Sequence, residues 1–136
     1  MKIIGFSFTK ISIEKKETKF EKPKITQNID IKEITKEKNL VSNSDTLKVK
    51  FNFNIIYSED FAKLEFEGNV ILLPEKKELD EFLKSWKNKK IPDNSRIPLF
   101  NFIMHKCNVK ALSLEDEFGL PVHIPFPRLS PNKEDQ

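Results

Sequence analysis

The stretch 47–72, LKVKFNFNIIYSEDFAKLEFEGNVIL, decides the fold of this chain. Every second residue of 47–57 is apolar, and lysines and asparagines hold most of the positions between them. The same alternation runs through 62–72, with glutamates prominent on the polar side. Because strand side chains point alternately to opposite faces, each half is predicted to be a strand with one buried and one wet face. The polar residues 58–60 between the halves predict the turn of a β-hairpin.

Two further strands are predicted before the hairpin, and each changes parity once. In 3–14, IIGFSFTKISIE, Phe6 and Phe8 share one parity whereas Ile11 and Ile13 share the other. A strand can keep both pairs on one face only through a bulge or kink, which we place near residues 9–10. A similar slip after residue 31 predicts a long, bent second strand that begins at residue 25.

Two helices follow the strands. Residues 75–90, EKKELDEFLKSWKNKK, come after Pro74 and carry acids at the start and lysines at the end, as the helix macrodipole favours. The apolar stripe of this first helix is Leu79, Phe82, Leu83 and Trp86. The second helix is predicted to have Asn94 or Ser95 as its N-cap, with Pro98 in its first turn and Gly119 just after its end. Apolar residues spaced by three and four form its stripe, namely Ile97, Phe100, Met104, Cys107, Ala111 and Leu114.

The N-terminal half of the second helix is apolar on most of its sides, because Leu99, Phe102 and Ile103 widen the stripe. Such a helix must be enclosed, and in a short chain we expect another subunit to enclose it. The alternative is that the first helix and the sheet cover it within one protomer.

Composition fits one domain, which we place at 1–129, followed by a polar tail at 130–136. The net charge of +3 is a small difference between 24 basic and 21 acidic residues, so a nucleic-acid partner is not indicated. A single cysteine, Cys107, excludes an internal disulfide and fits a reducing compartment. No apolar run is long enough for a signal peptide or a membrane span, and we expect a cytoplasmic protein without membrane insertion.

The sequence offers no catalytic machinery. Its two histidines are His105 and His123. Cys107 is two residues from His105, so on a helix the two side chains point in different directions and cannot bind one metal ion together. Phosphate-binding and nucleophile-elbow motifs are absent, and the acidic and basic runs read as solvated helix faces. We therefore predict a protein that is not an enzyme, with no catalytic residues, no metal and no cofactor.

The closing segment 119–131, GLPVHIPFPRLSP, alternates four prolines with apolar residues and so cannot form a helix. Two interpretations are open. The segment packs flat against its own sheet as a strap, or its side chains line a groove for a partner.

Taken in order, these pieces resemble the SecB family of export chaperones over about residues 3–129. The resemblance is carried by IIGFSFTKISIE, by the hairpin with Ala62 and Gly68, by the helix entered through IPLFNFI, and by GLPVHIPFPRL. It implies an α+β fold in which a four-stranded antiparallel sheet carries two C-terminal helices on one face. It also implies a homo-oligomer, a dimer of dimers, with helices buried between the sheets.

The resemblance further implies that unfolded polypeptide clients lie in a groove lined by aromatic and aliphatic side chains. The matching positions are Phe100, Phe102, Phe118, Leu120, Pro121, Ile124 and Phe126. For the oligomer interface we predict Phe82, Trp86, Ile97, Met104 and Cys107.

From these expectations we predict an ATP-independent holdase that binds non-native polypeptides. Protein export is one process in which it would act. Export-type members of the family are strongly acidic and dock the export motor through carboxylates, whereas this chain carries +3. The alternative function is a non-enzymatic assembly or adaptor protein with one fixed protein partner. A nucleic-acid-binding module is a third and weaker alternative.

Overall fold

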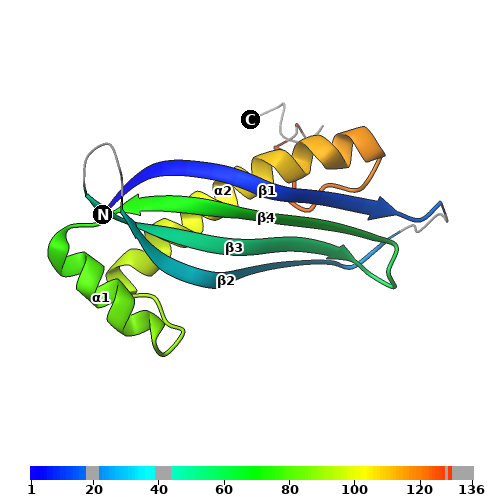
Figure 1. Ribbon diagram of the computed structural model, residues 1–136. Helices are drawn as coiled ribbons and strands as arrows, with labels where there is room; N and C mark the ends of the chain where they lie inside the picture. Colours follow the sequence, from blue (N-terminus) through cyan, green and yellow to red (C-terminus); the bar gives the residue numbers. More distant parts are fainter. Residues whose placement is uncertain (18–21, 39–43, 128, 130–136) are drawn as a thin grey trace.

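The computed structural model describes residues 1–17, 22–38, 44–127 and 129, so the predicted polar tail at 130–136 lies outside the described residues (Figure 1). Four strands precede two helices. The strands are β1 (Lys2–Lys15), β2 (Ile25–Lys38), β3 (Asp45–Tyr57) and β4 (Ala62–Leu73), and the helices are α1 (Lys76–Trp86) and α2 (Asp93–Phe118). The four strands form one sheet in the order β1-β4-β3-β2, with every neighbouring pair antiparallel.

The α+β class and the four-stranded antiparallel sheet are as predicted. Figure 1 shows α2 crossing one face of the sheet diagonally, with α1 at the end of the sheet where β1 begins. The core lies between this face and the helices. It contains the inward side chains of β3 and β4 together with Leu79 and Phe82 of α1 and Leu99 and Ile103 of α2.

The β3–β4 hairpin forms the centre of the sheet, in the register that the alternation predicts. Leu47 pairs with Leu72 and Tyr57 pairs with Ala62. The turn has positive φ at both Glu59 and Asp60, as in a type I′ turn, whose twist matches that of the two strands.

Bulges on both outer strands confirm the predicted parity changes. The register of β1 shifts between Phe8 and Lys10, and that of β2 shifts between Ile31 and Glu33. Each bulge returns the apolar side chains beyond it to the helix-covered face. A further shift between Ile3 and Gly5 was not predicted, and Ile4, which it leaves out of register, is 45% exposed.

Gly68 makes room for an aromatic contact across the centre of the sheet. It pairs with Phe51 on one side and with Phe8 on the other. The Phe51 ring stacks on Phe6 with centroids 5.6 Å apart. A Cβ at position 68 would lie 2.7 Å from Phe51 Cζ and 2.4 Å from the Ser7 carbonyl oxygen. The contact between β1 and β3 therefore depends on a residue without a side chain on β4.

Helix α1 begins with a capping box between Glu75 and Glu78, and it ends at Trp86, four residues earlier than predicted. Glu78 also holds the N-terminal ammonium of Met1, with distances of 2.8 and 3.0 Å from the nitrogen to its two carboxylate oxygens. These hydrogen bonds lower the pKa of Glu78. The start of β1 is thereby tied to α1.

The expected start of the second helix was wrong. Helix α2 begins at Asp93 with Pro92 as the N-cap, so Pro98 lies inside the helix beyond its first turn. The helix extends further because Ser95, at 4% exposed, and Leu99, fully buried, dock its first turns on the core. Tertiary packing outweighs the local capping preference here. The end at Gly119, which has a φ of 66°, is as predicted.

The buried face of α2 also differs in part from the predicted stripe. Buried residues recur every four positions, at Ser95, Leu99, Ile103, Cys107 and Ala111, and then at Leu114 and Glu115. Ile97 is 63% exposed, whereas Phe100 and Met104 are half-buried. Leu99 and Ile103, expected only to widen the stripe, are its centre.

We expect the substitution Gly68→Ala to lower the free energy of unfolding by about 1–3 kcal/mol, because the new methyl group forces Phe51 and the β1 backbone to shift. Urea denaturation followed by circular dichroism measures the change. Gly5→Ala is the comparison variant, since its Cβ would meet only the Ile71 side chain, at 3.2 Å. An equal loss in both variants would contradict the proposed role of the Phe51 ring.

Candidate functional site

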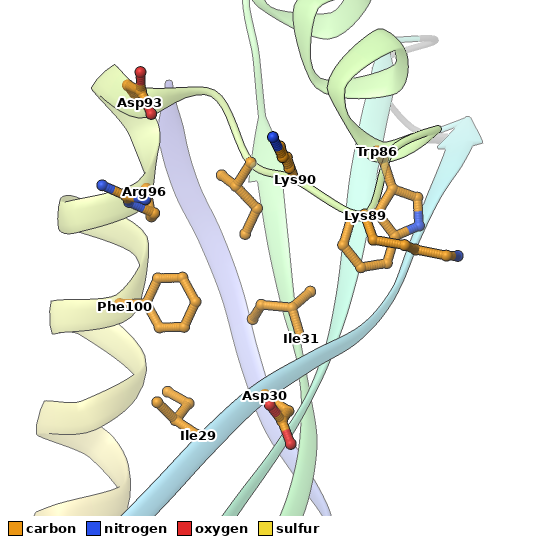
Figure 2. A pocket seen from close by; sticks show the side chains of 10 residues that line it. Ile29, Asp30, Ile31, Trp86, Lys89, Lys90, Asp93, Arg96 and Phe100 are labelled. Carbon is orange, nitrogen blue, oxygen red and sulfur yellow. The ribbon is translucent and has the colours of Figure 1, made fainter.

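An open groove of about 450 Å³ lies between β2, the end of α1 and the beginning of α2. Figure 2 shows it from close by. It is lined by Ile29, Asp30, Ile31, Trp86, Lys89, Lys90, Ile91, Asp93, Arg96 and Phe100. We call it the β2–α2 groove.

The floor of the β2–α2 groove is apolar because of strand alternation. Ile29 and Ile31 pair with Phe53 and Phe51 and share the helix-covered face. In Figure 2, Phe100 points from α2 towards Ile31 across the groove, and Trp86 stands at the end of α1. The aromatic and aliphatic walls thus come from β2 and from the two helices that follow the sheet.

Cations predominate at the rim. Lys89, Lys90 and Arg96 stand there against Asp93, which is the first residue of α2. Asp30 of β2 also lines the groove, and its carboxylate lies 3.7 Å from Lys32 Nζ. Lys89 Nζ lies 4.8 Å from the centroid of the Trp86 ring. Within the described residues, no ion pair involves Lys90 or Arg96.

The groove runs beside an outer strand. In the order β1-β4-β3-β2, the described residues place no strand beyond β2. Alternate backbone amide and carbonyl groups of such a strand point away from the sheet and can pair with an added chain. Side-chain pockets next to an open strand edge suit an extended peptide.

A second cluster fixes the start of the closing segment. Glu115 on α2 is fully buried, and the ring Nδ1 of His123 lies 2.9 and 3.0 Å from its two carboxylate oxygens. The other ring nitrogen, Nε2, lies 2.8 Å from Asn108 Oδ1. The Tyr57 hydroxyl reaches both Glu115 Oε2 and the carbonyl oxygen of Pro121. A buried carboxylate with several hydrogen-bond partners is stable only while they all remain in place.

Burial raises the pKa of two titratable groups in the core. Burial, and then hydrogen bonding to Glu115, raises the pKa of Tyr57. Burial also raises the pKa of the Cys107 thiol to about 12, which keeps it protonated at neutral pH. The described residues contain no group of three His, Cys, Asp or Glu side chains placed to hold a metal ion.

The structure places the seven predicted polypeptide-binding residues in different settings. Phe100 lines the β2–α2 groove. Phe102 contacts Phe6 of β1, with ring centroids 5.8 Å apart. Phe118, at the end of α2, is 40% exposed, and its carbonyl oxygen accepts a hydrogen bond from Lys15 Nζ. At 1.5 Å per helical residue, Phe100 and Phe118 are about 27 Å apart along α2.

The closing segment divides into a packed part and an exposed part. Leu120 is buried, the Pro121 carbonyl oxygen is hydrogen-bonded, and Ile124 is half-buried. This first part is a strap. Phe126, by contrast, is 60% exposed, and Leu129 is 88% exposed. The second part presents apolar side chains to solvent.

The five predicted interface residues also differ in exposure. Phe82 and Cys107 are fully buried within the protomer. Trp86 is half-buried and lines the β2–α2 groove, and Met104 is half-buried on α2. Ile97, at 63% exposed, has the most free surface of the five.

Sequence analysis missed most of the groove. Ile29 and Ile31 were read only as strand residues, and the lysines at 89 and 90 only as partners of the helix dipole. The feature that identifies the groove is an outer strand, β2, that carries isoleucines on one face and has only one neighbouring strand. The sequence shows the isoleucines, but only the structure shows the strand order.

The arrangement of sheet and helices is the SecB-like fold, which confirms the resemblance seen in the sequence at the level of fold. A solved structure with this architecture is the SecB-like chaperone Rv1957 of Mycobacterium tuberculosis, in complex with a ChAD peptide from the Rv1956 HigA1 antitoxin. The likeness has a TM-score of 0.51 at 14% sequence identity and covers 95% of this chain and 90% of that chain. No family model and no curated protein matches the sequence. Within the described residues, no helix is long and apolar enough to span a membrane.

We expect His123→Ala to release the strap, because the buried Glu115 carboxylate loses a hydrogen-bond partner. The free energy of unfolding should fall by about 1–3 kcal/mol, and amide hydrogen exchange at residues 120–124 should accelerate. The matched control is His105→Ala on the exposed surface of α2, which should change neither quantity. Unchanged exchange in His123→Ala would show that the cluster does not hold the segment.

The Cys107 thiol should not react with Ellman's reagent at pH 8 in the native protein, because it is buried and protonated. The same thiol should react within seconds to minutes in 6 M guanidinium chloride. A fast native reaction would contradict the burial of this face of α2.

Proposed function

We propose that the protein is an ATP-independent, SecB-like chaperone, a holdase that binds extended segments of non-native polypeptides in the β2–α2 groove. The observation that carries the proposal is a groove with an apolar floor, open to solvent, beside the unpaired edge of β2. Such a site takes its affinity from side-chain burial and backbone pairing, neither of which requires one particular sequence.

The energetics favour clients that use several contacts. Burying one large apolar side chain contributes about 2 kcal/mol, at roughly 25 cal/mol per Å² of apolar surface. Since association itself has a large entropic cost, micromolar affinity requires two or more such contacts. The exposed rings of Phe118 and Phe126 provide further apolar surface near the end of α2. They lie outside the β2–α2 groove, because the end of α2 contacts Lys15 of β1, at the opposite edge of the sheet.

Holding a client in this way uses binding alone, so the proposed activity needs neither nucleotide nor metal. We propose a cytoplasmic, non-enzymatic protein that self-associates through the outward face of α2. Ile97 at 63% and Val109 at 58% exposed support that surface, because apolar side chains on an outer helix face favour burial against a partner. A dimer of dimers is the assembly we expect.

The second candidate function is an adaptor for one fixed protein partner. It is favoured by the solved SecB-like chaperone, which holds a peptide from a single antitoxin. The two functions differ in promiscuity. An adaptor discriminates strongly among peptides, whereas a holdase accepts any extended chain with suitable side chains.

The deciding experiment is suppression of aggregation of two unrelated, chemically denatured proteins, without nucleotide and at near-stoichiometric ratio. We expect light scattering from both clients to fall. If aggregation of neither client is suppressed, the holdase proposal is wrong. If aggregation of only one client is suppressed, the adaptor function is favoured.

Replacing Ile31 by Ser should weaken client binding about threefold to thirtyfold, because the apolar floor loses area. Binding is measured by fluorescence anisotropy of a labelled, permanently unfolded client. Ile11→Ser is the matched control, since Ile11 is a partly exposed isoleucine on β1, the opposite edge of the sheet. Light-scattering mass on both variants checks that assembly is intact. Equal weakening in both variants would remove the groove from the proposal.

A further inference from the structure

We propose that the β2–α2 groove selects acidic client segments, in which an apolar anchor is separated by one residue from a carboxylate that Arg96 binds. This inference rests on the proposed function and specifies the chemistry of the partner. Three observations carry it: the charge of the rim, the spacing of Arg96 and Phe100 on α2, and the open edge of β2.

The groove lining carries three cations against two carboxylates, so positive charge predominates there. Three cations, Lys89, Lys90 and Arg96, stand against Asp93 on the helix side of the groove. Asp30 of β2 is the second carboxylate of the lining, and it is paired only loosely with Lys32, at 3.7 Å between two exposed side chains. Lys90 and Arg96 make no ion pair with any described residue, so both are available to a client.

The spacing of the two key side chains matches an extended chain. Arg96 and Phe100 are four residues apart on α2, so their side chains lie about one helical turn apart on the same side of the helix, at a rise of about 6 Å. Residues i and i+2 of a strand also point to the same side, about 6.8 Å apart. A client aromatic against Phe100 therefore places the side chain two residues away beside Arg96. A carboxylate there can accept two parallel hydrogen bonds from the guanidinium group.

The outer position of β2 determines the line along which the client lies. A chain paired with β2 runs along the groove, with alternate side chains pointing towards Phe100 and Arg96 and the others pointing away. This alternation explains why the selected positions are two residues apart and not adjacent. An acidic residue directly next to the anchor would face the opposite side.

The contribution of the carboxylate is to selectivity more than to total affinity. Arg96 is exposed, so water and salt screen the interaction. We expect a preference of about threefold to tenfold at low ionic strength, and we expect it to diminish as salt is raised from 50 to 500 mM.

The test uses labelled peptides of identical length, with one phenylalanine anchor and Glu, Gln or Lys two residues away, and a fourth peptide with Glu adjacent to the anchor. Anisotropy titrations on the full chain should rank the i+2 Glu peptide tightest and the Lys peptide weakest. Arg96→Gln should abolish the preference, and Arg96→Glu should reverse it in favour of Lys. Lys77→Glu is the matched control, because Lys77 is an exposed cation on α1 outside the groove.

The outcomes separate this inference from the proposed function. Binding of all four peptides with equal affinity, unchanged in both Arg96 variants, overturns the acidic preference while client binding stands. No binding of any peptide overturns the proposed function as well. A preference for Glu that persists in Arg96→Glu assigns the effect to other charges and also overturns the proposal.

Discussion

The fold depends on keeping most of the apolar side chains of four long strands on one face of a single sheet. The central hairpin meets this constraint by strict alternation, with Leu47 through Tyr57 opposite Ala62 through Leu72. The outer strands cannot meet it without help, because their apolar residues change parity. A bulge in each strand restores the common face. Without the bulge in β2, the isoleucines on its two sides would point to opposite faces.

The same constraint produces the candidate site. Once Ile29 and Ile31 point towards the helices on a strand with only one neighbour, α2 can cover them only in part. The first turns of α2 and the end of α1 leave the space that forms the β2–α2 groove (Figure 2). The core and the groove are therefore two parts of one apolar layer, sealed at the centre of the sheet and open at its edge.

The sequence was informative where the pattern is local. Period-two alternation over eleven residues has few alternative explanations, and the β3–β4 hairpin and both bulges were predicted from it. The start of α2 was not predictable in this way, because burial of Ser95 and Leu99 stabilises turns that capping rules would exclude. The candidate site was predicted only at Phe100 and Trp86, and the latter was assigned to an interface. The remaining groove residues come from separate elements, and no local sequence pattern indicates that these elements lie side by side in the fold.

The bulge in β2 has one more consequence. It interrupts the outer edge after Ile31, so a chain that pairs with residues 25–31 cannot continue in register along residues 33–38. The bulge therefore limits the length over which any added chain can pair with β2. It also hinders the strand-upon-strand stacking that an uninterrupted open edge invites, and with it the growth of fibrils.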